Sequence, residues 1–543
     1  MSDRFPMRTV PPVLEARYRA ERFWTGETLG HLLDAHLRAS PELELCVWSD
    51  TRPFCGTFGE LHQRARQFAG ALQRCGIGPG DVVSFQLPNW VEAAVCFWGS
   101  ALAGAVIAPI VHIYERREVG FILSQSHARL HVTAERFGHI DYQAMLADLR
   151  PDVPDLERVV TVGADFDDFT SGNALQEGQV DVDPAEPVTL SYTSGTTAEP
   201  KGVIHTHDTL VAEVVQRWLP VDGKTDAVPL LIPGPPHAEL TVSPVGHVTG
   251  MQTALLMPVV RHTAIHLMDQ FDPGAYLKTM ADNDLGFAGG ATVFLTSLLD
   301  HPTFGPEHLQ RMQYFICGGA PIPLAVAERA AKLGIGMMRA YGSTEHPSVT
   351  GSAYFDPEDE RVATDGRALP GVELRIVDER GEPVPDGTAG EIQSRGPDLL
   401  AGYTNTALND EAFTGDGWFR SGDVGVLDAA GFLTITDRKK DIIIRGGENI
   451  SAAEVEELMM RLPGIAEVAV VAAPDARLGE HVCAFVRVHP GAAAPDFEQV
   501  RQHLDHAGLS RRKWPEEVRV LDELPRTPSG KIQKFRLREM AAP

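Results

Sequence analysis

Residues 192–202, YTSGTTAEPKG, place hydroxyl groups, glycines and a lysine in one short segment behind an apolar run. Glycines leave backbone N–H groups accessible, so such a loop can surround phosphate oxygens while an ammonium adds a movable positive charge. The candidate donors are Thr193, Ser194, Gly195, Thr196, Thr197 and Lys201. A Ser/Thr/Gly loop considered alone is also typical of a solvated connection between strands.

Two common nucleotide-binding loops are excluded. The Walker pattern requires GxxxxGK[ST], and the GKT at 223–225 has Trp218 where the first glycine should stand. The GIGPG at 76–80 follows a predicted helix and lacks the GxGxxG spacing of a dinucleotide fold. The loop at 192–202 therefore predicts a different type of phosphate site.

Lysine placement supports a role in anion binding. Only nine of the 48 basic residues are lysines, and the first of them is Lys201. Where arginine is so preferred, a lysine in a glycine-framed loop indicates that a compact, mobile ammonium is needed. Lys439 and Lys440 in DRKKD and Lys531 in RTPSGKIQK have comparable settings. Chance explains one such placement more easily than all of them.

Alternating helices and apolar strands must position these loops. Thr57 and Glu60 form a capping box before a helical repeat that ends at Gly76. Apolar strands then recur at 82–87, 106–111, 187–193, 312–319 and 336–343. This pattern predicts a wound, largely parallel sheet covered by helices, with ligands bound at the carboxyl ends of the strands.

The 543 residues exceed what one hydrophobic core usually organises, so we expect at least two domains. After about residue 370, short strands with Gly/Asp turns predict antiparallel β-structure. The charged stretch 437–441 then precedes a compact pattern of strands and helices. We predict an α/β protein with a large N-terminal domain (1–436) that includes a β-rich subdomain, a hinge (437–441) and a small mobile α+β domain (442–543).

Charge and composition limit the partners. A net charge of −26 argues against nucleic acid or an anionic membrane as a general partner. The uncharged stretch 93–111 is divided by Gly104 and Pro109, which predicts a buried helix and a core strand and no transmembrane segment. Six cysteines without a CxxC pair favour reduced thiols and a cytoplasmic location. The clustered histidines show no zinc-site spacing.

Five motifs together resemble the adenylate-forming superfamily, which includes acyl-CoA synthetases, firefly luciferases and peptide-synthetase adenylation domains. They are YTSGTTAEPKG, YGSTE (341–345), FRSGD (419–423), TDRKKDIIIRGGENISAAEVE (436–456) and PRTPSGKIQK (525–534). The resemblance extends from about residue 50 to the end. It implies a two-step reaction: a carboxylate attacks the α-phosphorus of ATP to give an acyl adenylate and pyrophosphate, and the thiol of coenzyme A then displaces AMP.

The resemblance also implies roles for individual residues. The loop from Thr193 to Lys201 would bind the β- and γ-phosphates, Thr344 the α-phosphate, and Glu345 the Mg²⁺ that accompanies ATP. The adenosine-binding residues would be Gly318, Gly319, Ala320, Pro321, Tyr341, Gly342, Asp423 and Arg438. A core role for Tyr341 and a turn role for Asp423 remain the alternatives.

In the same superfamily, Lys531 corresponds to the lysine that is catalytic for adenylation. The small domain then rotates about a residue matching Lys440 to present Gly446 and Gly447 to coenzyme A. Such a rotation answers a geometric conflict, because two nucleophiles cannot approach one centre through the same closed cavity.

The acyl pocket is assigned to His247, Gly318 and Gly342, with a core role for His247 as the alternative. The expected walls, about 235–250 and GSTEHPSV (342–349), are mostly small and neutral, which disfavours an amino acid and favours an apolar short- to medium-chain, alicyclic or aromatic acid. Ala198 departs from the superfamily pattern, which usually has glycine there. A carrier-protein acceptor, oxidative use of the adenylate, a regulator without catalysis and a homodimer stay open.

Overall fold

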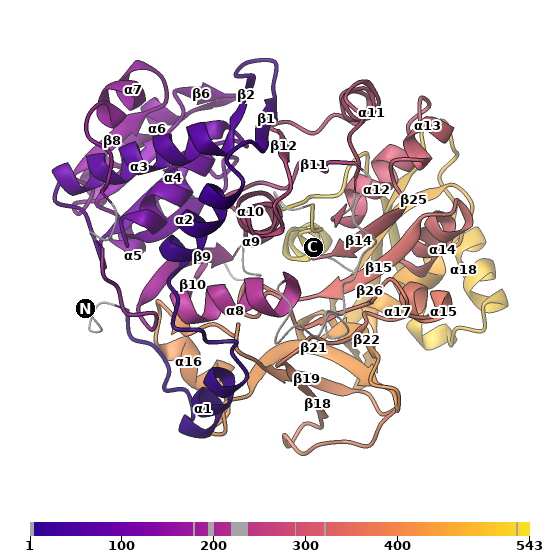
Figure 1. Ribbon diagram of the computed structural model, residues 1–543. Helices are drawn as coiled ribbons and strands as arrows, with labels where there is room; N and C mark the ends of the chain where they lie inside the picture. The colour runs from indigo at the N-terminus through magenta and orange to yellow at the C-terminus, as the bar shows by residue number, and fades with distance from the viewer. Residues whose placement is uncertain are drawn as a thin grey trace.

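The computed structural model describes residues 5–176, 180–193, 200–218, 237–287, 289–319, 322–527 and 530–542. Figure 1 shows helices and sheets of the N-terminal part at the left and centre, an antiparallel sheet at the bottom, and the C-terminal part at the right. The end of the chain, helix α19 (Lys534–Ala541), lies in the middle of this view, among the other parts. Arg538 of this helix donates to the carbonyl oxygen of Lys440, almost one hundred residues earlier.

The largest sheet has seven strands in the order β20-β10-β9-β4-β3-β5-β8. Its strands are β3 (Val82–Gln86), β4 (Val106–Ile110), β5 (Leu130–Thr133), β8 (Arg158–Thr161), β9 (Pro187–Thr193), β10 (Lys201–Thr206) and β20 (Gly402–Tyr403). The pairs from β9 to β8 are parallel, whereas β10 runs antiparallel to both of its neighbours. The predicted wound, largely parallel sheet is confirmed.

Buried helices cover this sheet. Helix α3 (Phe58–Arg74) begins with the predicted capping box, in which Thr57 and Glu60 bond reciprocally. Helix α4 (Val91–Leu102) is buried along its whole length and leads into β4, so the uncharged stretch 93–111 is a core helix followed by a core strand. Among the described residues, every helix falls short of the length and apolarity that a membrane crossing requires.

Two further sheets complete the region around the centre. A four-stranded sheet contains β11 (Leu240–Thr241), β12 (Ile265–Met268), β1 (Glu44–Trp48) and β2 (Phe54–Thr57). A five-stranded sheet contains β13 (Gly289–Gly290), β14 (Tyr314–Gly318), β15 (Gly336–Tyr341), β16 (Thr350–Gly351) and β17 (Arg367–Ala368). Along the chain between β10 and β12 lie helix α8 (His207–Trp218), helix α9 (Val248–Gly250), the π-helix η4 (Met251–Leu256) and helix α10 (Met257–Arg261).

The β-rich region after residue 370 is antiparallel, as predicted. Its strands are β18 (Glu373–Val377), β19 (Gly390–Arg395), β21 (Phe419–Leu427) and β22 (Leu433–Arg438). The remaining labelled helices of the large region are α1 (Pro12–Ala20), α2 (Leu29–Ala39), α5 (Arg116–Ser126), α6 (Tyr142–Leu149), α7 (Ala164–Thr170), α11 (Pro273–Asp282), α12 (Thr292–Leu299), α13 (Pro306–Leu309), α14 (Leu324–Lys332), α15 (Glu358–Ala363) and α16 (Ala407–Ala412).

The C-terminal part has an α+β arrangement with its own core. Its sheet contains β23 (Ile443–Arg445), β24 (Glu448–Ile450), β25 (Ile465–Asp475), β26 (Gly479–Val488) and β27 (Glu517–Val520). Helices α17 (Ala452–Met459) and α18 (Phe497–His506) contribute Val455 and Leu504 to the apolar cluster beneath that sheet. A single 3₁₀ turn, η5 (Lys439–Asp441), connects it to β22. The predicted α/β class with a smaller α+β C-terminal domain is confirmed.

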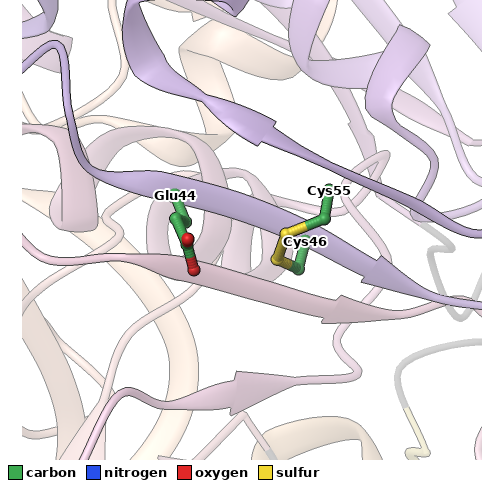
Figure 2. Close-up of side chains that lie close together, drawn as sticks. All are labelled: Glu44, Cys46 and Cys55. Carbon is green, nitrogen blue, oxygen red and sulfur yellow. A yellow bond between two sulfur atoms is a disulfide. The ribbon is translucent and has the colours of Figure 1, made fainter.

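The expectation that all cysteines are reduced is wrong for one pair. Cys46 on β1 and Cys55 on β2 are register partners and form a disulfide (Figure 2). Glu44 lies on the same face of β1, two residues away, and these three are the only group of potential metal ligands found in the described ranges. Because the two sulfurs are bonded to each other, they offer no thiolate to a metal ion. The described free cysteines are Cys75, Cys96, Cys317 and Cys483.

Candidate active site

A cavity of about 370 Å³ lies where the ends of β14 and β15 face the C-terminal part. Its described lining includes Tyr341, Gly342 and Thr344 from the end of β15, together with Lys531. Lys531 follows the C-terminal sheet by more than ten residues, yet it shares this cavity with residues almost two hundred positions earlier. The structure therefore brings together the predicted catalytic lysine and the predicted phosphate-binding threonine.

The turn after β15 places Thr344 and Glu345. Gly342 is required in it because a Cβ atom there would lie 2.0 Å from the carbonyl oxygen of Pro347. Glu345 accepts a hydrogen bond from the Tyr403 hydroxyl at 3.0 Å, and its carbonyl oxygen accepts one from the backbone N–H of Leu400 at 2.8 Å. The carboxylate of Glu345 is thus held at a fixed place beside the cavity.

A buried polar network lies directly behind this turn. His346 contacts Asp398 at 3.1 Å, and Asp398 also accepts from the backbone N–H of Ser348 at 3.2 Å. His205 on β10 contacts the carbonyl oxygen of Thr344 at 2.8 Å. Buried polar groups that are mutually satisfied rigidify their surroundings. The network therefore fixes the backbone that carries Thr344.

Three of the predicted adenosine-binding residues form a chain of contacts. Asp423, which is buried on β21, accepts from the Tyr341 hydroxyl at 2.7 Å and from the Arg438 guanidinium at 2.7 Å. Burial beside the Asp423 carboxylate raises the pKa of Tyr341, so its hydroxyl remains a donor. Ion pairing with Asp423 raises the pKa of Arg438. A turn role alone does not explain a buried carboxylate with two such partners.

The phosphate loop lies mostly outside the described residues. Thr193 ends β9 and Lys201 begins β10, and the two are register partners at the base of the loop. Ser194, Gly195, Thr196 and Thr197 fall in the undescribed stretch, as do Ala320 and Pro321 of the predicted adenosine site. The Lys201 ammonium lies 5.7 Å from the centre of the Tyr403 ring, and Tyr403 in turn contacts Glu345. The base of the loop therefore lies close to the predicted metal-binding carboxylate.

Lys531 enters the cavity from a short loop. Gly530 has a left-handed φ of +84°, and a Cβ atom there would lie 2.6 Å from a methyl group of Val293, so the loop tolerates only glycine without rearrangement. The backbone N–H of Lys531 donates to the Thr527 hydroxyl at 3.1 Å. Removal from water and the nearby Arg438 lower the pKa of Lys531 to about 8.

This pKa predicts the pH dependence of the adenylation step that the resemblance implies. Burial and Arg438 lower the pKa of Lys531, whereas Asp423 and Glu345 raise it. The net result leaves the Lys531 side chain protonated below about pH 8 and neutral above it. Because only the ammonium form can stabilise phosphate charge, we expect kcat/KM for ATP in adenylation to fall about tenfold per pH unit above that value. Arginine stays charged, so Lys531→Arg should show no such fall, whatever its absolute rate. Parallel profiles for both proteins would contradict this assignment.

The assigned acyl-pocket residues all line the cavity: His247, Gly318 and Gly342. His247 caps helix α9, where its Nδ1 accepts from the backbone N–H of Thr249 at 3.3 Å. Burial, with Lys531 nearby, lowers the pKa of His247 to about 3, so the imidazole is neutral at pH 7. A core histidine without access to the cavity is excluded by this position.

The cavity wall is more polar than the sequence indicated. Besides small residues, it includes Glu239, Gln252, Arg261 and His266. Three of these lie outside the walls that sequence reasoning assigned, because the π-helix η4, helix α10 and strand β12 bring them in from a different region. The prediction of a mostly small, neutral wall holds only for the part near β14 and β15.

The predicted hinge and coenzyme A residues are absent from the described cavity lining. Lys440 is in η5, where its carbonyl oxygen accepts from Arg538 of α19 at 3.0 Å. Gly446 and Gly447 form the exposed turn between β23 and β24 and are absent from the described cavity lining. In this arrangement the C-terminal domain presents Lys531, and not the two glycines, to the centre.

The residues present fit the Mg²⁺ that the resemblance implies. Glu345 forms no salt bridge to any described residue, and it accepts a hydrogen bond from the hydroxyl group of Tyr403. A carboxylate among hydroxyl groups suits a hard cation that prefers oxygen ligands. Glu345 would hold a Mg²⁺ ion that arrives with ATP, and that ion would neutralise phosphate charge.

Sequence reasoning missed Tyr403. This residue lies on the short strand β20, which pairs with β10, and it contacts both Glu345 and Lys201. An aromatic residue within AGYTN, directly after the apolar Leu399 and Leu400, was the only available signal. Nothing local in that segment indicates pairing with a strand two hundred residues earlier.

Comparisons with known proteins agree with this geometry. The AMP-binding enzyme family matches residues 33–404, and the C-terminal domain of AMP-binding enzymes matches residues 454–531. The chain is 32% identical over 533 residues to a medium-chain fatty-acid–CoA ligase of Escherichia coli, covering 96% of this chain and 92% of that protein. It is 34% identical over 505 residues to a 3-[(3aS,4S,7aS)-7a-methyl-1,5-dioxo-octahydro-1H-inden-4-yl]propanoyl:CoA ligase of Rhodococcus jostii, covering 89% and 93%. The structure of ATP-bound MatB from Rhodopseudomonas palustris superimposes with a TM-score of 0.81 at 29% identity, covering 94% of this chain and 98% of that one.

Proposed function

Because the chain belongs to the AMP-binding enzyme family, we propose that it is an ATP-dependent acid–CoA ligase that proceeds through an acyl adenylate. The observation that carries the proposal is the entry of Lys531, from the C-terminal domain, into the cavity that contains Thr344 and Tyr341. The first family match contains the motifs YTSGTTAEPKG and YGSTE, and the second ends at Lys531, which supports the same conclusion.

In the first half-reaction, a carboxylate oxygen of the acid attacks the α-phosphorus of ATP, and the bond to the β-phosphate oxygen breaks. Negative charge concentrates on the phosphate oxygens in the transition state, where a preorganised cation stabilises it most. Lys531 would supply that charge at the α-phosphate, and the hydroxyl of Thr344 would donate a hydrogen bond there. Thr193 and Lys201, at the base of the phosphate loop, would contact the departing pyrophosphate.

The nucleoside would be held by the contact chain on β15 and β21. The ring of Tyr341 offers an aromatic face for adenine, and the Asp423 carboxylate can accept from ribose hydroxyls in addition to its present donors. Arg438 would then contact ribose or phosphate. Each of these side chains already has a fixed partner, so the site is largely preformed.

In the second half-reaction, the thiol sulfur of coenzyme A attacks the acyl carbonyl carbon, AMP leaves with the bonding electron pair, and the thiol proton is lost. Gly446 and Gly447 are exposed and are not part of the described cavity lining in the present arrangement. Rotation of residues 442–543 about the hinge at 437–441, centred on Lys440, would exchange Lys531 for these glycines. Such rigid-body exchange is a common route by which one site serves two steps.

The acid is proposed to have an apolar body of short to medium length, alicyclic or aromatic. The two relatives are named for a medium-chain fatty acid and for a propanoyl group that carries a bicyclic dioxo ring. No lysine other than Lys531 and no aspartate lines the described cavity, and the Glu239 carboxylate in its wall already has Arg261 and Tyr314 as partners, which disfavours activation of an amino acid.

A panel of carboxylic acids tests this function. Pyrophosphate release is measured for each acid with ATP and Mg²⁺, with and without coenzyme A, and the thioester is identified by mass spectrometry. Acid-dependent pyrophosphate release followed by acyl-CoA formation is the expected result. Adenylate without thioester would instead indicate a carrier-protein acceptor. A protein that binds ATP but activates no acid of the panel would be a nucleotide-binding regulator.

A further inference from the structure

The cavity reaches from Lys531 to the π-helix η4, where Gln252 forms part of its wall. The side chain of Gln252 is only 5% exposed, and its Nε2 amide nitrogen has no hydrogen-bond partner among the described residues. Burying a hydrogen-bond donor without a partner is unfavourable, because the donor loses its hydrogen bonds to water and gains none within the protein. A group that enters the cavity can supply the missing acceptor.

Thr253, the neighbouring residue of the same π-helix, has no such unpaired donor. The Thr253 hydroxyl, which also lines the cavity, donates to the carbonyl oxygen of Thr249 at 2.9 Å. π-Helical turns are rare and occur frequently at functional sites, because the wider turn redirects side chains. Here Gln252 lines the cavity with an unpaired amide nitrogen, whereas the Thr253 hydroxyl is paired with the carbonyl oxygen of Thr249.

A second buried polar atom lies in the same wall. His266 on β12 is 8% exposed, and its Nδ1 has no partner among the described residues. Burial lowers the pKa of His266, so the ring is neutral at pH 7 and offers one donor and one acceptor. The cavity wall therefore has more than one polar group available to a ligand.

The wall around these groups has little net charge. Arg261 and Glu239 both line the cavity, 3.9 Å apart, and the Tyr314 hydroxyl donates to the same Glu239 oxygen at 3.1 Å. A ligand group placed here meets a cation and an anion together. Such a wall favours a neutral hydrogen-bond acceptor over a second carboxylate.

We propose that the acid activated by this enzyme has a neutral oxygen acceptor, a ketone or hydroxyl group, on the part of its apolar body remote from the carboxylate, and that Gln252 is the specificity residue that donates to it. The inference rests on the proposed function, since the carboxylate of the same molecule must reach the Lys531 end of the cavity. It specifies the substrate class further: an oxygenated alicyclic or aromatic acid, and not the plain hydrocarbon.

The test compares matched acids on matched variants. Adenylation is measured with cyclohexanecarboxylate and with its 3-oxo and 4-oxo derivatives, which differ only by a carbonyl group in place of a methylene. We expect the unchanged enzyme to favour one oxo acid by at least about tenfold in kcat/KM, because a site built to hydrogen-bond a substrate discriminates against the analogue that lacks the group. Gln252→Met, similar in volume and apolar, should reduce that ratio to within about twofold.

Two further variants make the result specific. Thr296→Val removes a hydroxyl that is already bonded within its own helix, at the carbonyl oxygen of Thr292, and that is not part of the described cavity lining, so it should leave the ratio between the two acids unchanged. Gln252→Glu keeps the shape but presents an acceptor, so it should select against the oxo acid even if Gln252→Met folds poorly. Thermal unfolding of each variant separates a loss of fold from a change of preference.

The possible results distinguish a failure of this inference from a failure of the proposed ligase function. If cyclohexanecarboxylate is activated but no oxo acid is preferred, or if Gln252→Met keeps the preference, the acceptor is water and the inference fails while the ligase function stands. If the unchanged enzyme activates no acid of the panel, the proposed function fails and the inference fails with it.

Discussion

Lys531→Ala is expected to reduce acyl-adenylate formation by at least about 100-fold, equivalent to about 3 kcal/mol of transition-state stabilisation. The reason is positional: Lys531 is the only lysine in the described lining of the cavity, and it faces Thr344 and Tyr341. Thioester formation from supplied acyl adenylate should be almost unaffected, because the proposed rotation removes Lys531 from the centre before that step.

The measurement is a pair of half-reactions on one preparation. Adenylation is followed by pyrophosphate release, and thioester formation by consumption of synthetic acyl adenylate with coenzyme A. Lys513→Ala is the control, because Lys513 is a solvent-accessible lysine of the same domain that pairs with Glu454. An equal loss in both half-reactions would show that Lys531 has a structural and not a step-specific role.

Glu345→Gln should have the second largest effect, a fall of about 100-fold in adenylation together with a higher Mg²⁺ concentration for half-maximal activity. Glutamine can still accept the hydrogen bond from Tyr403, so the fold of the turn is retained and only the charge is lost. A neutral amide is a poor ligand for a hard divalent cation. The effect should therefore appear as a shift in the Mg²⁺ titration as well as in the rate.

Glu358→Gln is the matched control for this change. Glu358 lies on α15, is exposed, and is not part of the described cavity lining. It should leave both rate and Mg²⁺ dependence unaltered. If Glu345→Gln lowered the rate with no change in the Mg²⁺ requirement, the carboxylate would act on the protein and not on the metal.

The fold followed closely from sequence because the deciding signals are local. The capping box of Thr57 and Glu60 and the Gly104–Pro109 division each depend on a few neighbouring residues, and the structure confirms both. The Cys46–Cys55 pair could not be anticipated, because adjacency of β1 and β2 depends on which strands pair. A spacing of nine residues by itself does not distinguish a strand pair from two separate thiols.

Site residues that belong to sequence motifs could be predicted, whereas site residues that are brought into the cavity by packing could not. Lys531, Thr344 and Tyr341 belong to ordered motifs, and the structure places them in one cavity. The cavity wall formed by Gln252 and Arg261 has no motif. Its composition depends on a π-helix and on the way α10 meets β12, and no short stretch of sequence encodes either.

The ion pair between Asp423 and Arg438, at 2.7 Å, joins the nucleoside site to the segment on which the small domain is proposed to turn. Arg438 is the last residue of β22, and η5 begins at the next residue. If a ribose hydroxyl donates to Asp423, as proposed, the carboxylate accepts hydrogen bonds from both the nucleoside and Arg438, the residue next to the hinge. In the proposed mechanism, binding or release of AMP would change the contact between Asp423 and Arg438 and would thereby be coupled to the position of the hinge.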